Sequence, residues 1–230
     1  MPEMTSSGDP HVLKTTAGDL SLEEYHLRLE GRAWRILHTG AILSLADEQR
    51  FLDPAREEPR VPYGIVLWPA AIALAHDIAS RSIGGKRVLE LGAGTGLPGI
   101  VAASLGAHVV QTDRQELALL VCKQNAQRNA ITTIEHRVAD WTAWEDREPY
   151  DVILGSDVLY GDAMHPHLRR IFETNLAPGG TILLSDPFRH SSFACLEALE
   201  ADGWNVTMNK WTVGITPPER AVGVFELTRR

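Results

Sequence analysis

One stretch, between residues 88 and 99, constrains the fold of this chain more than any other. It starts as the apolar run Val88–Leu91, which is typical of a buried parallel strand, and continues as a series of alternating glycines from Gly92 onward. The apolar segment Ile100–Leu105 follows and predicts a helix. Glycines let the backbone bend sharply and approach a ligand, and the start of a helix offers free N–H groups. The sequence therefore predicts a nucleotide-type binding turn.

Two interpretations of this turn are open. Gly94, Gly96 and Gly99 satisfy the G-x-G-x-x-G fingerprint of dinucleotide-binding domains. The segment from Glu90 through Gly92 to Gly96 also resembles the first motif of the S-adenosylmethionine (SAM) methyltransferases. We favour the second interpretation, because a carboxylate at Glu90 would repel a pyrophosphate but suits a cofactor that carries an ammonium group.

Length and composition predict one globular domain with a full core. The chain has 230 residues, of which 44% are hydrophobic, so it can bury a core without metals or disulfides. Cys122 and Cys195 are far apart and are expected to be reduced core thiols. The net charge of -8 argues against a protein that grips nucleic acid over a broad surface. No leader and no apolar run near the ~20 residues that span a bilayer are apparent, so a cytoplasmic protein with no membrane partner is expected.

Strands and helices alternate along most of the chain, which predicts an α/β fold with a parallel sheet covered by helices on both faces. Residues 1–60 are expected to be an N-terminal extension with a β-hairpin that turns at Glu30-Gly31, and residues 61–230 the main domain. A helix is expected from Trp68 to Ala79. Further helices are predicted at about 116–129, 165–175 and 191–201, and strands at 25–29, 34–36, 41–43, 109–113, 135–141, 151–157, 181–186, 204–213 and 222–227.

Four consecutive strands of the predicted sheet end in a carboxylate: Glu90, Asp113, Asp140 and Asp157. Ligands of open parallel sheets bind outside the carboxyl ends of the strands. Asp113 follows the glycine turn by about the ~20 residues expected for a carboxylate that accepts from both ribose hydroxyls. Asp140 can accept from an adenine amino group, and the neighbouring Trp141 can stack on the ring or pack in the core. These residues predict a nucleoside site at one edge of the sheet.

The same positions identify a family resemblance. The glycine motif, Asp113, the segment Ala139–Trp141 and the D-x-x-Y segment Asp157–Tyr160 resemble the seven-strand (class I) SAM methyltransferases, and more narrowly their lysine methyltransferase branch, methyltransferase family 16. The resemblance implies a Rossmann-like sheet of order 3-2-1-4-5-7-6 with an antiparallel seventh strand, and SAM as the cofactor. It carries over as cofactor contacts Trp68, Glu90, Gly92, Ala93, Gly94, Gly96, Asp113, Asp140, Trp141 and Ser156.

Asp157 and Tyr160 are the expected catalytic residues. An amine acceptor must attack without its proton, and a neighbouring carboxylate raises the amine pKa. Asp157 still helps, because positive charge moves onto the nitrogen in the transition state, and Tyr160 supplies an aromatic wall for the cation. The favoured acceptor is a protein lysine; a small amine, or a catalytically silent SAM-binding protein, are the alternatives. No metal site is expected, and the sequence leaves the oligomeric state open.

The acceptor is expected to enter beside three loops. The loop at Phe188–His190 should face the connection 214–220, whose Pro217 and Pro218 favour a rigid lip, and residues 53–63 should close a third side.

Overall fold

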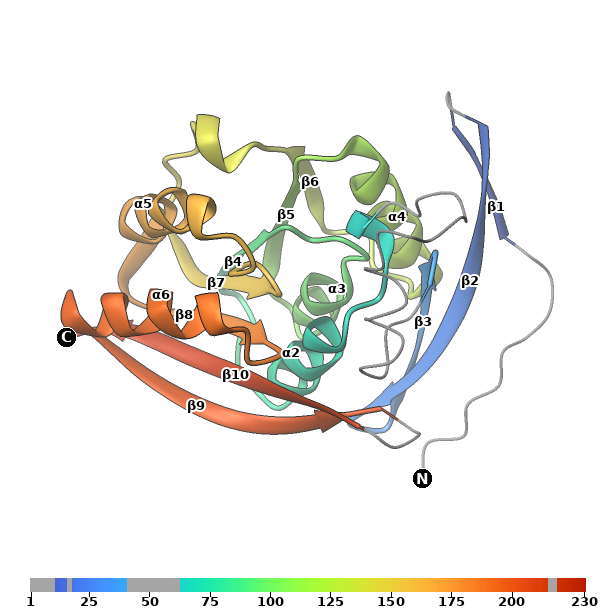
Figure 1. Ribbon diagram of the computed structural model, residues 1–230. Coiled ribbons are helices and arrows are strands. Elements are labelled where there is room, and N and C mark those ends of the chain that lie inside the picture. Colours follow the sequence, from blue (N-terminus) through green and yellow to red (C-terminus); the bar gives the residue numbers. More distant parts are fainter. Residues whose placement is uncertain (1–10, 16–17, 41–62, 215–218) are drawn as a thin grey trace, which may run out of the picture.

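The computed structural model describes residues 11–15, 18–40, 63–214 and 219–230. The expected strand at 41–43, most of the lip at 214–220, most of the loop at 53–63 and the predicted domain boundary near residue 60 lie outside these residues. The described elements form a central sheet between layers of helices, with a small second sheet against one side (Figure 1).

The central sheet has seven strands in the order β6-β5-β4-β7-β8-β10-β9. Numbered along this domain, that order is 3-2-1-4-5-7-6, as expected. Five strands pair in parallel, whereas β10 runs antiparallel to both β8 and β9. Their bounds are β4 Arg87–Leu91, β5 His108–Asp113, β6 Glu135–Val138, β7 Tyr150–Ser156, β8 Leu176–Asp186, β9 Trp204–Val213 and β10 Arg220–Arg229. Because β9 is antiparallel to β10, it runs in the direction of the parallel strands, which confirms the expected direction of strand six.

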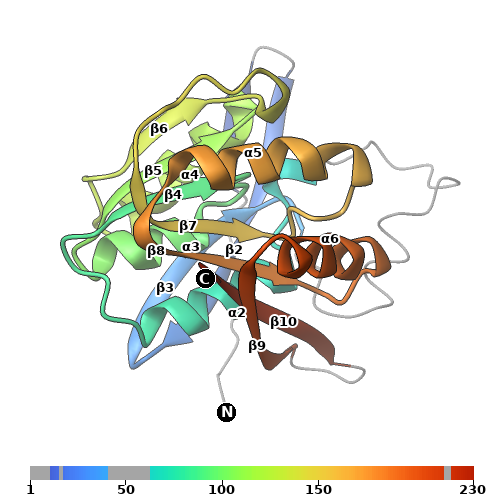
Figure 2. The same ribbon diagram turned by 90° about the vertical axis from the view of Figure 1, so that its left-hand side faces the viewer.

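Helices cover both faces of this sheet (Figures 1 and 2). Residues that alternate along β4 divide between two apolar clusters: Val88 packs with α2 and α3, and Leu89 with α5 and α6. The bounds are α2 Pro69–Ala79, α3 Leu97–Ser104, α4 Glu116–Arg128, α5 His165–Asn175 and α6 His190–Ala201. Short 3-10 turns occur at η1 Tyr63–Ile65, η2 Trp141–Ala143 and η3 Asp162–Met164. No helix among the described residues is both long and apolar enough to cross a membrane.

Two strands of the central sheet, β6 and β8, differ most from their expected bounds. Strand β6 ends at Val138 rather than at Trp141, because Asp140 caps η2 by accepting a hydrogen bond from the backbone N–H of Thr142. Strand β8 starts at Leu176 rather than Thr181. Its first residue, Leu176, pairs with Tyr150, and the next pair is Thr181 with Val152. The glycines that were expected to form a turn lie within this shift in register.

The small sheet contains β1 His11–Thr15, β2 Gly18–Leu29 and β3 Arg32–His38, all antiparallel. The expected hairpin is confirmed: β2 and β3 pair around a two-residue turn in which Glu30 has φ 45° and Gly31 has φ 78°. Two successive positive φ angles are those of the type I′ turn, whose twist matches paired strands.

Asn125 of α4 and Asn129, which caps the carboxyl end of α4, join this sheet to the rest of the fold. Asn125 accepts a hydrogen bond from the backbone N–H of Leu37 at 2.7 Å and donates to the carbonyl oxygens of Leu37 at 3.1 Å and of Thr95 at 2.9 Å. Asn129 makes the equivalent pair with the backbone of Arg35. Each side-chain amide therefore pairs with the N–H and carbonyl of one β3 residue, as the backbone of a neighbouring strand would. Asn125 also contacts the glycine turn, to which Thr95 belongs.

Candidate active site

A cavity of about 640 Å³ opens at the carboxyl ends of β4, β5 and β7. It lies where an open α/β sheet binds its ligand, next to the strand at which the order reverses. It brings together most of the residues expected at the site: Trp68, Gly92, Ala93, Gly94, Asp113, Asp140, Trp141, Ser156, Asp157 and Tyr160.

The glycine turn forms one wall of the cavity, in which Gly92 and Gly94 alternate with Ala93 and Thr95. Gly92, Gly94 and Gly96 have φ angles of 62°, 58° and 79°, which disfavour any residue with a side chain. A Cβ atom at Gly92 would lie 3.3 Å from the Trp141 ring, and one at Gly94 would lie 3.0 Å from a backbone oxygen. At Gly92 and Gly94, both the backbone conformation and the close neighbours therefore favour glycine.

Glu90 and Gly96, which are both expected cofactor contacts, do not line this cavity. The Glu90 side chain points behind the turn and is buried: its Oε2 accepts from the backbone N–H of Gly99 at 3.2 Å and from Gln111 Nε2 at 2.7 Å. Gln111 also donates to the Gly96 carbonyl. Burial raises the pKa of Glu90 to about 8. Glu90 therefore holds the glycine turn from its buried side. Because its carboxyl group does not line the cavity, it gives no reason to expect that a pyrophosphate would be repelled there.

Asp113 presents a buried carboxylate to the cavity beside the glycine turn. Its Oδ2 accepts from the backbone N–H of Gly94 at 3.2 Å and its Oδ1 from that of Gln115 at 2.9 Å. Burial raises its pKa, and these hydrogen bonds oppose the change. A carboxylate oriented in this way suits the paired hydroxyl groups of a ribose.

The two tryptophans after β6 have different environments. Trp141 lines the cavity, whereas Trp144 is buried in the core and donates from Nε1 to Asn175 at 2.9 Å. Asp140 is exposed, and its hydrogen bonds with Thr142 lower its pKa. Backbone N–H groups, the Asp113 carboxylate and the Trp141 ring thus provide complementary partners for a nucleoside with a charged tail.

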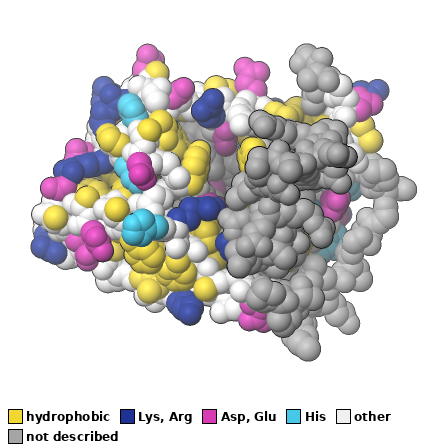
Figure 3. All heavy atoms as spheres, viewed as in Figure 1, with side chains coloured by type: hydrophobic (Ala, Val, Ile, Leu, Met, Phe, Trp, Pro, Cys, Tyr) yellow, Lys and Arg dark blue, Asp and Glu magenta, His cyan; other side chains and the backbone are white. Residues whose placement is uncertain are grey.

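At the other end of the cavity, Asp157 and Tyr160 follow β7. Asp157 is held in the left-handed region at φ 52°, and its N–H donates to the Ser185 carbonyl at 2.7 Å. Tyr160 is 62% exposed at the rim. Hydrophobic side chains gather on the surface near α6 (Figure 3). In this helix Phe193 is 41% exposed, and its ring stacks on that of Phe188 with 6.0 Å between the ring centroids.

Sequence reasoning missed two basic side chains that line the cavity, Arg114 and Arg189. Arg189 donates from Nε and Nη2 to the two oxygens of Asp157, at 2.9 and 2.8 Å. Its loop was expected to face the acceptor, but the contact itself gives no signal in a sequence. In the described part of the chain, no three His, Cys, Asp or Glu side chains form a group that could hold a metal ion.

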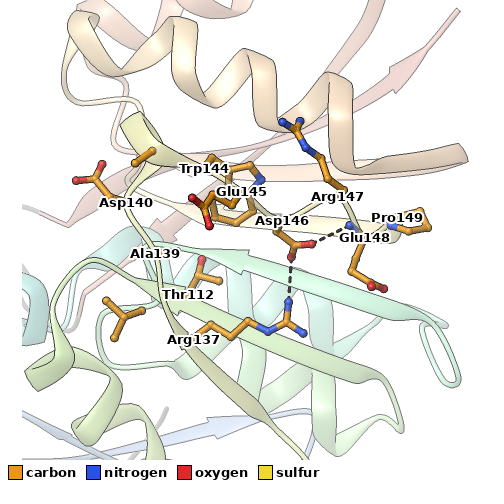
Figure 4. Close-up of a pocket in the computed structure, with 12 residues that line it drawn as sticks. Thr112, Arg137, Ala139, Asp140, Trp144, Glu145, Asp146, Arg147, Glu148 and Pro149 are labelled. Atoms are coloured by element: carbon orange, nitrogen blue, oxygen red, sulfur yellow. Dashed lines mark hydrogen bonds and ion pairs between the residues drawn. The ribbon is translucent and has the colours of Figure 1, made fainter.

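A second cavity, of about 670 Å³, shares Ala139 and Asp140 with the first (Figure 4). It contains none of the glycine-turn residues. Asp146 organises its charged groups, accepting from Arg137 at 3.1 Å, from the Glu148 N–H at 2.7 Å and from the Tyr150 hydroxyl at 2.7 Å. These contacts tie the 145–149 segment to β6 and β7, which is a structural role.

Comparison with known proteins agrees with this geometry. The family model described as "Lysine methyltransferase" matches residues 50–194. The chain is 30% identical over 187 residues to the EEF1A lysine methyltransferase 3 of Xenopus tropicalis, covering 78% of this chain and 75% of that protein. It is 39% identical to the Protein N-lysine methyltransferase METTL21A of Xenopus tropicalis, and 41% to the Histone-arginine methyltransferase METTL23 of Mus musculus. These matches cover 54% and 44% of this chain, and 61% and 43% of those relatives.

Solved structures agree on the fold. A precorrin-6y C5,15-methyltransferase from Geobacter metallireducens has a TM-score of 0.58 at 14% identity, with 70% of this chain and 87% of that chain covered. A ribosomal protein L11 methylase from Lactobacillus delbrueckii has a TM-score of 0.55 at 19% identity, with 78% and 92% covered. The family match, rather than these structures, supports S-adenosylmethionine as the expected cofactor. With a family match over more than half of its length and a seven-strand sheet of the expected order, this chain belongs to the lysine methyltransferase family of the class I methyltransferases.

Proposed function

We propose that this chain transfers the methyl group of SAM to the side-chain nitrogen of a lysine in a protein, in the cytoplasm. One observation carries the proposal: a single cavity joins the glycine turn and Asp113 to Asp157 and Tyr160. The names of the relatives support a protein acceptor. The exposed aromatic side chains of Tyr160 and Phe193, beside the acceptor end of the cavity, provide an apolar surface for packing against a protein substrate. Cys122 and Cys195, both buried and unpaired, fit a reducing compartment.

The residues at the end of the cavity beside the glycine turn suit the cofactor. The backbone of the glycine turn, the Asp113 carboxylate and the Trp141 ring would hold its amino-acid tail, ribose and adenine, with Trp68 and Ser156 closing the sides. Glu90 and Gly96 contribute by fixing the turn. When bound, SAM supplies an electrophilic methyl group on a sulfonium.

At the acceptor end, the chain's own residues orient the nitrogen and exclude water. Asp157 stabilises the positive charge that develops on the nitrogen. Tyr160 provides an aromatic face for the lysine stem and the cation. Proton loss from the amine precedes attack, since a free lysine has a pKa near ~10.4.

The test incubates the purified protein with a cell lysate and SAM labelled in its methyl group. Label in N-methyllysine after hydrolysis of the protein fraction is the expected result, and the Asp157→Asn protein is the matched control. Label in methylarginine would favour the second candidate, which is suggested by the relatives named for histone arginine. Label in small molecules alone would make the acceptor a metabolite amine, and binding of the demethylated product with no labelling would indicate a silent protein.

Changing Asp113 to Ala is expected to weaken binding of SAM and its demethylated product. The lost hydrogen bonds involve a charged group, so the effect is about 1.5–3 kcal/mol, or roughly 10- to 150-fold in Kd by calorimetry. Asp140→Ala is the comparison: its exposed carboxylate already caps η2, and a smaller effect is expected. Unchanged affinity in Asp113→Ala would place Asp113 outside the site.

A further inference from the structure

The Asp157 carboxylate, placed at the acceptor end by the proposed function, is already bound by a cation of the chain itself. Arg189 approaches it as a fork, with Nε on Oδ1 at 2.9 Å and Nη2 on Oδ2 at 2.8 Å. The two side chains are 8% and 25% exposed, so water screens the pair only in part. This two-bond geometry is the strong and directional form of an arginine–carboxylate contact.

The backbone on both sides of this pair is anchored. Strands β7 and β8 lie in register at Ser156 and Ser185, which brings the loops after them together. The Arg189 N–H donates to Asp186 Oδ1 at 2.6 Å, and Ser192 Oγ donates to Asp186 Oδ2 at 2.6 Å. On the other side, the Ser185 carbonyl accepts from the Asp157 N–H. The pair is therefore built into the fold and is not a chance contact between two surface side chains.

Other charged groups face the acceptor end from the neighbouring elements. Asp186 lies behind the pair: it is buried, does not line the cavity, and has a pKa raised by burial. Burial raises the pKa of Tyr160, and the negative charges of Asp113, at the end of β5, and of Asp157 raise it further. The positive charge of Arg114 lowers it. These groups are the same in the variants below, so a comparison of variants isolates Arg189.

We propose that Arg189 is a positioning residue that holds both oxygens of Asp157 and neutralises its charge, so that the acceptor end of the cavity favours an uncharged amine over an ammonium ion. This inference rests on the proposed function. An unpaired carboxylate would bind the ammonium form tightly and raise the pKa of the amine. A paired carboxylate still orients the nitrogen and stabilises charge in the transition state, but it opposes proton loss less.

Removing Arg189 should therefore improve binding of a cation and impair transfer. The first test measures binding, independently of turnover, with Nα-acetyl-lysine methylamide as the probe, near neutral pH and with the demethylated cofactor present. In Arg189→Gln the probe, which is an ammonium ion at this pH, should bind about tenfold tighter, in line with roughly one pKa unit for an adjacent charge. The double variant Asp157→Asn/Arg189→Gln should lose this gain. Equal or weaker binding by Arg189→Gln would overturn the proposal.

The second test is the pH profile of methyl transfer. In Arg189→Gln the acidic limb should move up by about one pH unit, because the bound amine then holds its proton more firmly, and KM and kcat should both fall. Arg189→Lys, which keeps the charge, should stay near the wild-type limb. Arg87→Gln is the matched control, since it removes an arginine from an exposed pair with Glu148 outside the cavity. An unshifted limb in Arg189→Gln would refute the proposal; a wild-type protein that transfers no methyl group would refute only the proposed function.

Discussion

Turnover of the Asp157→Asn protein is expected to fall about 100-fold, the usual size of the loss of one group that stabilises transition-state charge. The amide keeps the shape of the carboxylate but cannot offset the positive charge that forms on the acceptor nitrogen. It also removes the Asp157 charge that offsets the Arg189 guanidinium at the same point. Both changes oppose a cation in the transition state.

Affinity for the demethylated cofactor should stay within about twofold, because Asp157 acts at the acceptor end and its effect grows in the transition state. Calorimetry and steady-state rates on the same preparations give the two numbers. Asp162→Asn is a suitable control, since it removes an exposed charge from the nearby η3 turn. Equal losses of cofactor affinity and rate would instead make Asp157 a cofactor ligand or a structural residue.

The second large effect is expected on stability. Asn125 is fully buried and bonds to the N–H and carbonyl of Leu37 and to the carbonyl of Thr95. Asn125→Ala leaves these buried groups without partners, which should cost on the order of 3 kcal/mol of unfolding free energy. For a chain of this length, that corresponds to a fall in Tm of roughly 6–12 °C.

Asn125→Ala should also weaken binding of the demethylated cofactor, because the Thr95 carbonyl belongs to the glycine turn. Asn129→Ala is the matched control, since Asn129 lies four residues after Asn125 and caps the carboxyl end of α4. It loses a similar pair of bonds to Arg35 but makes no contact with the turn. It should therefore lower Tm and leave cofactor affinity unchanged. A loss of affinity in Asn129→Ala as large as in Asn125→Ala would show that the small sheet as a whole, rather than the Asn125 bridge, supports the turn.

The features that sequence predicted well are encoded locally. The β2–β3 hairpin follows from strand patterns on both sides of Glu30-Gly31, where Gly31 supplies a residue that readily adopts positive φ. Strand β4 and the glycine turn follow from an apolar run that stops at glycine. The sheet order came from the resemblance and not from these patterns, because pairing between distant strands leaves no local signal.

The site was predicted less completely, because side-chain direction depends on the surrounding fold. Glu90 was expected to face the cofactor, but its register partner on β5 is Gln111, whose amide draws the carboxylate behind the turn. Trp141 and Trp144 look alike in sequence, but in the fold Trp144 is buried and hydrogen-bonded to Asn175, whereas Trp141 lines the cavity. The Asp157–Arg189 pair joins residues 32 positions apart and depends on the register of β7 and β8.

The buried position of Glu90 also couples folding of the glycine turn to the proton concentration. Its pKa is about 8 in the folded chain, against about 4.5 for an unperturbed glutamate. Between these two values the carboxyl group takes up a proton as the chain folds. The associated stabilisation is complete below the lower value and is lost as the pH rises through the upper one. Near neutral pH, a calorimetric enthalpy of folding therefore includes the heat released or absorbed when the buffer gives up that proton.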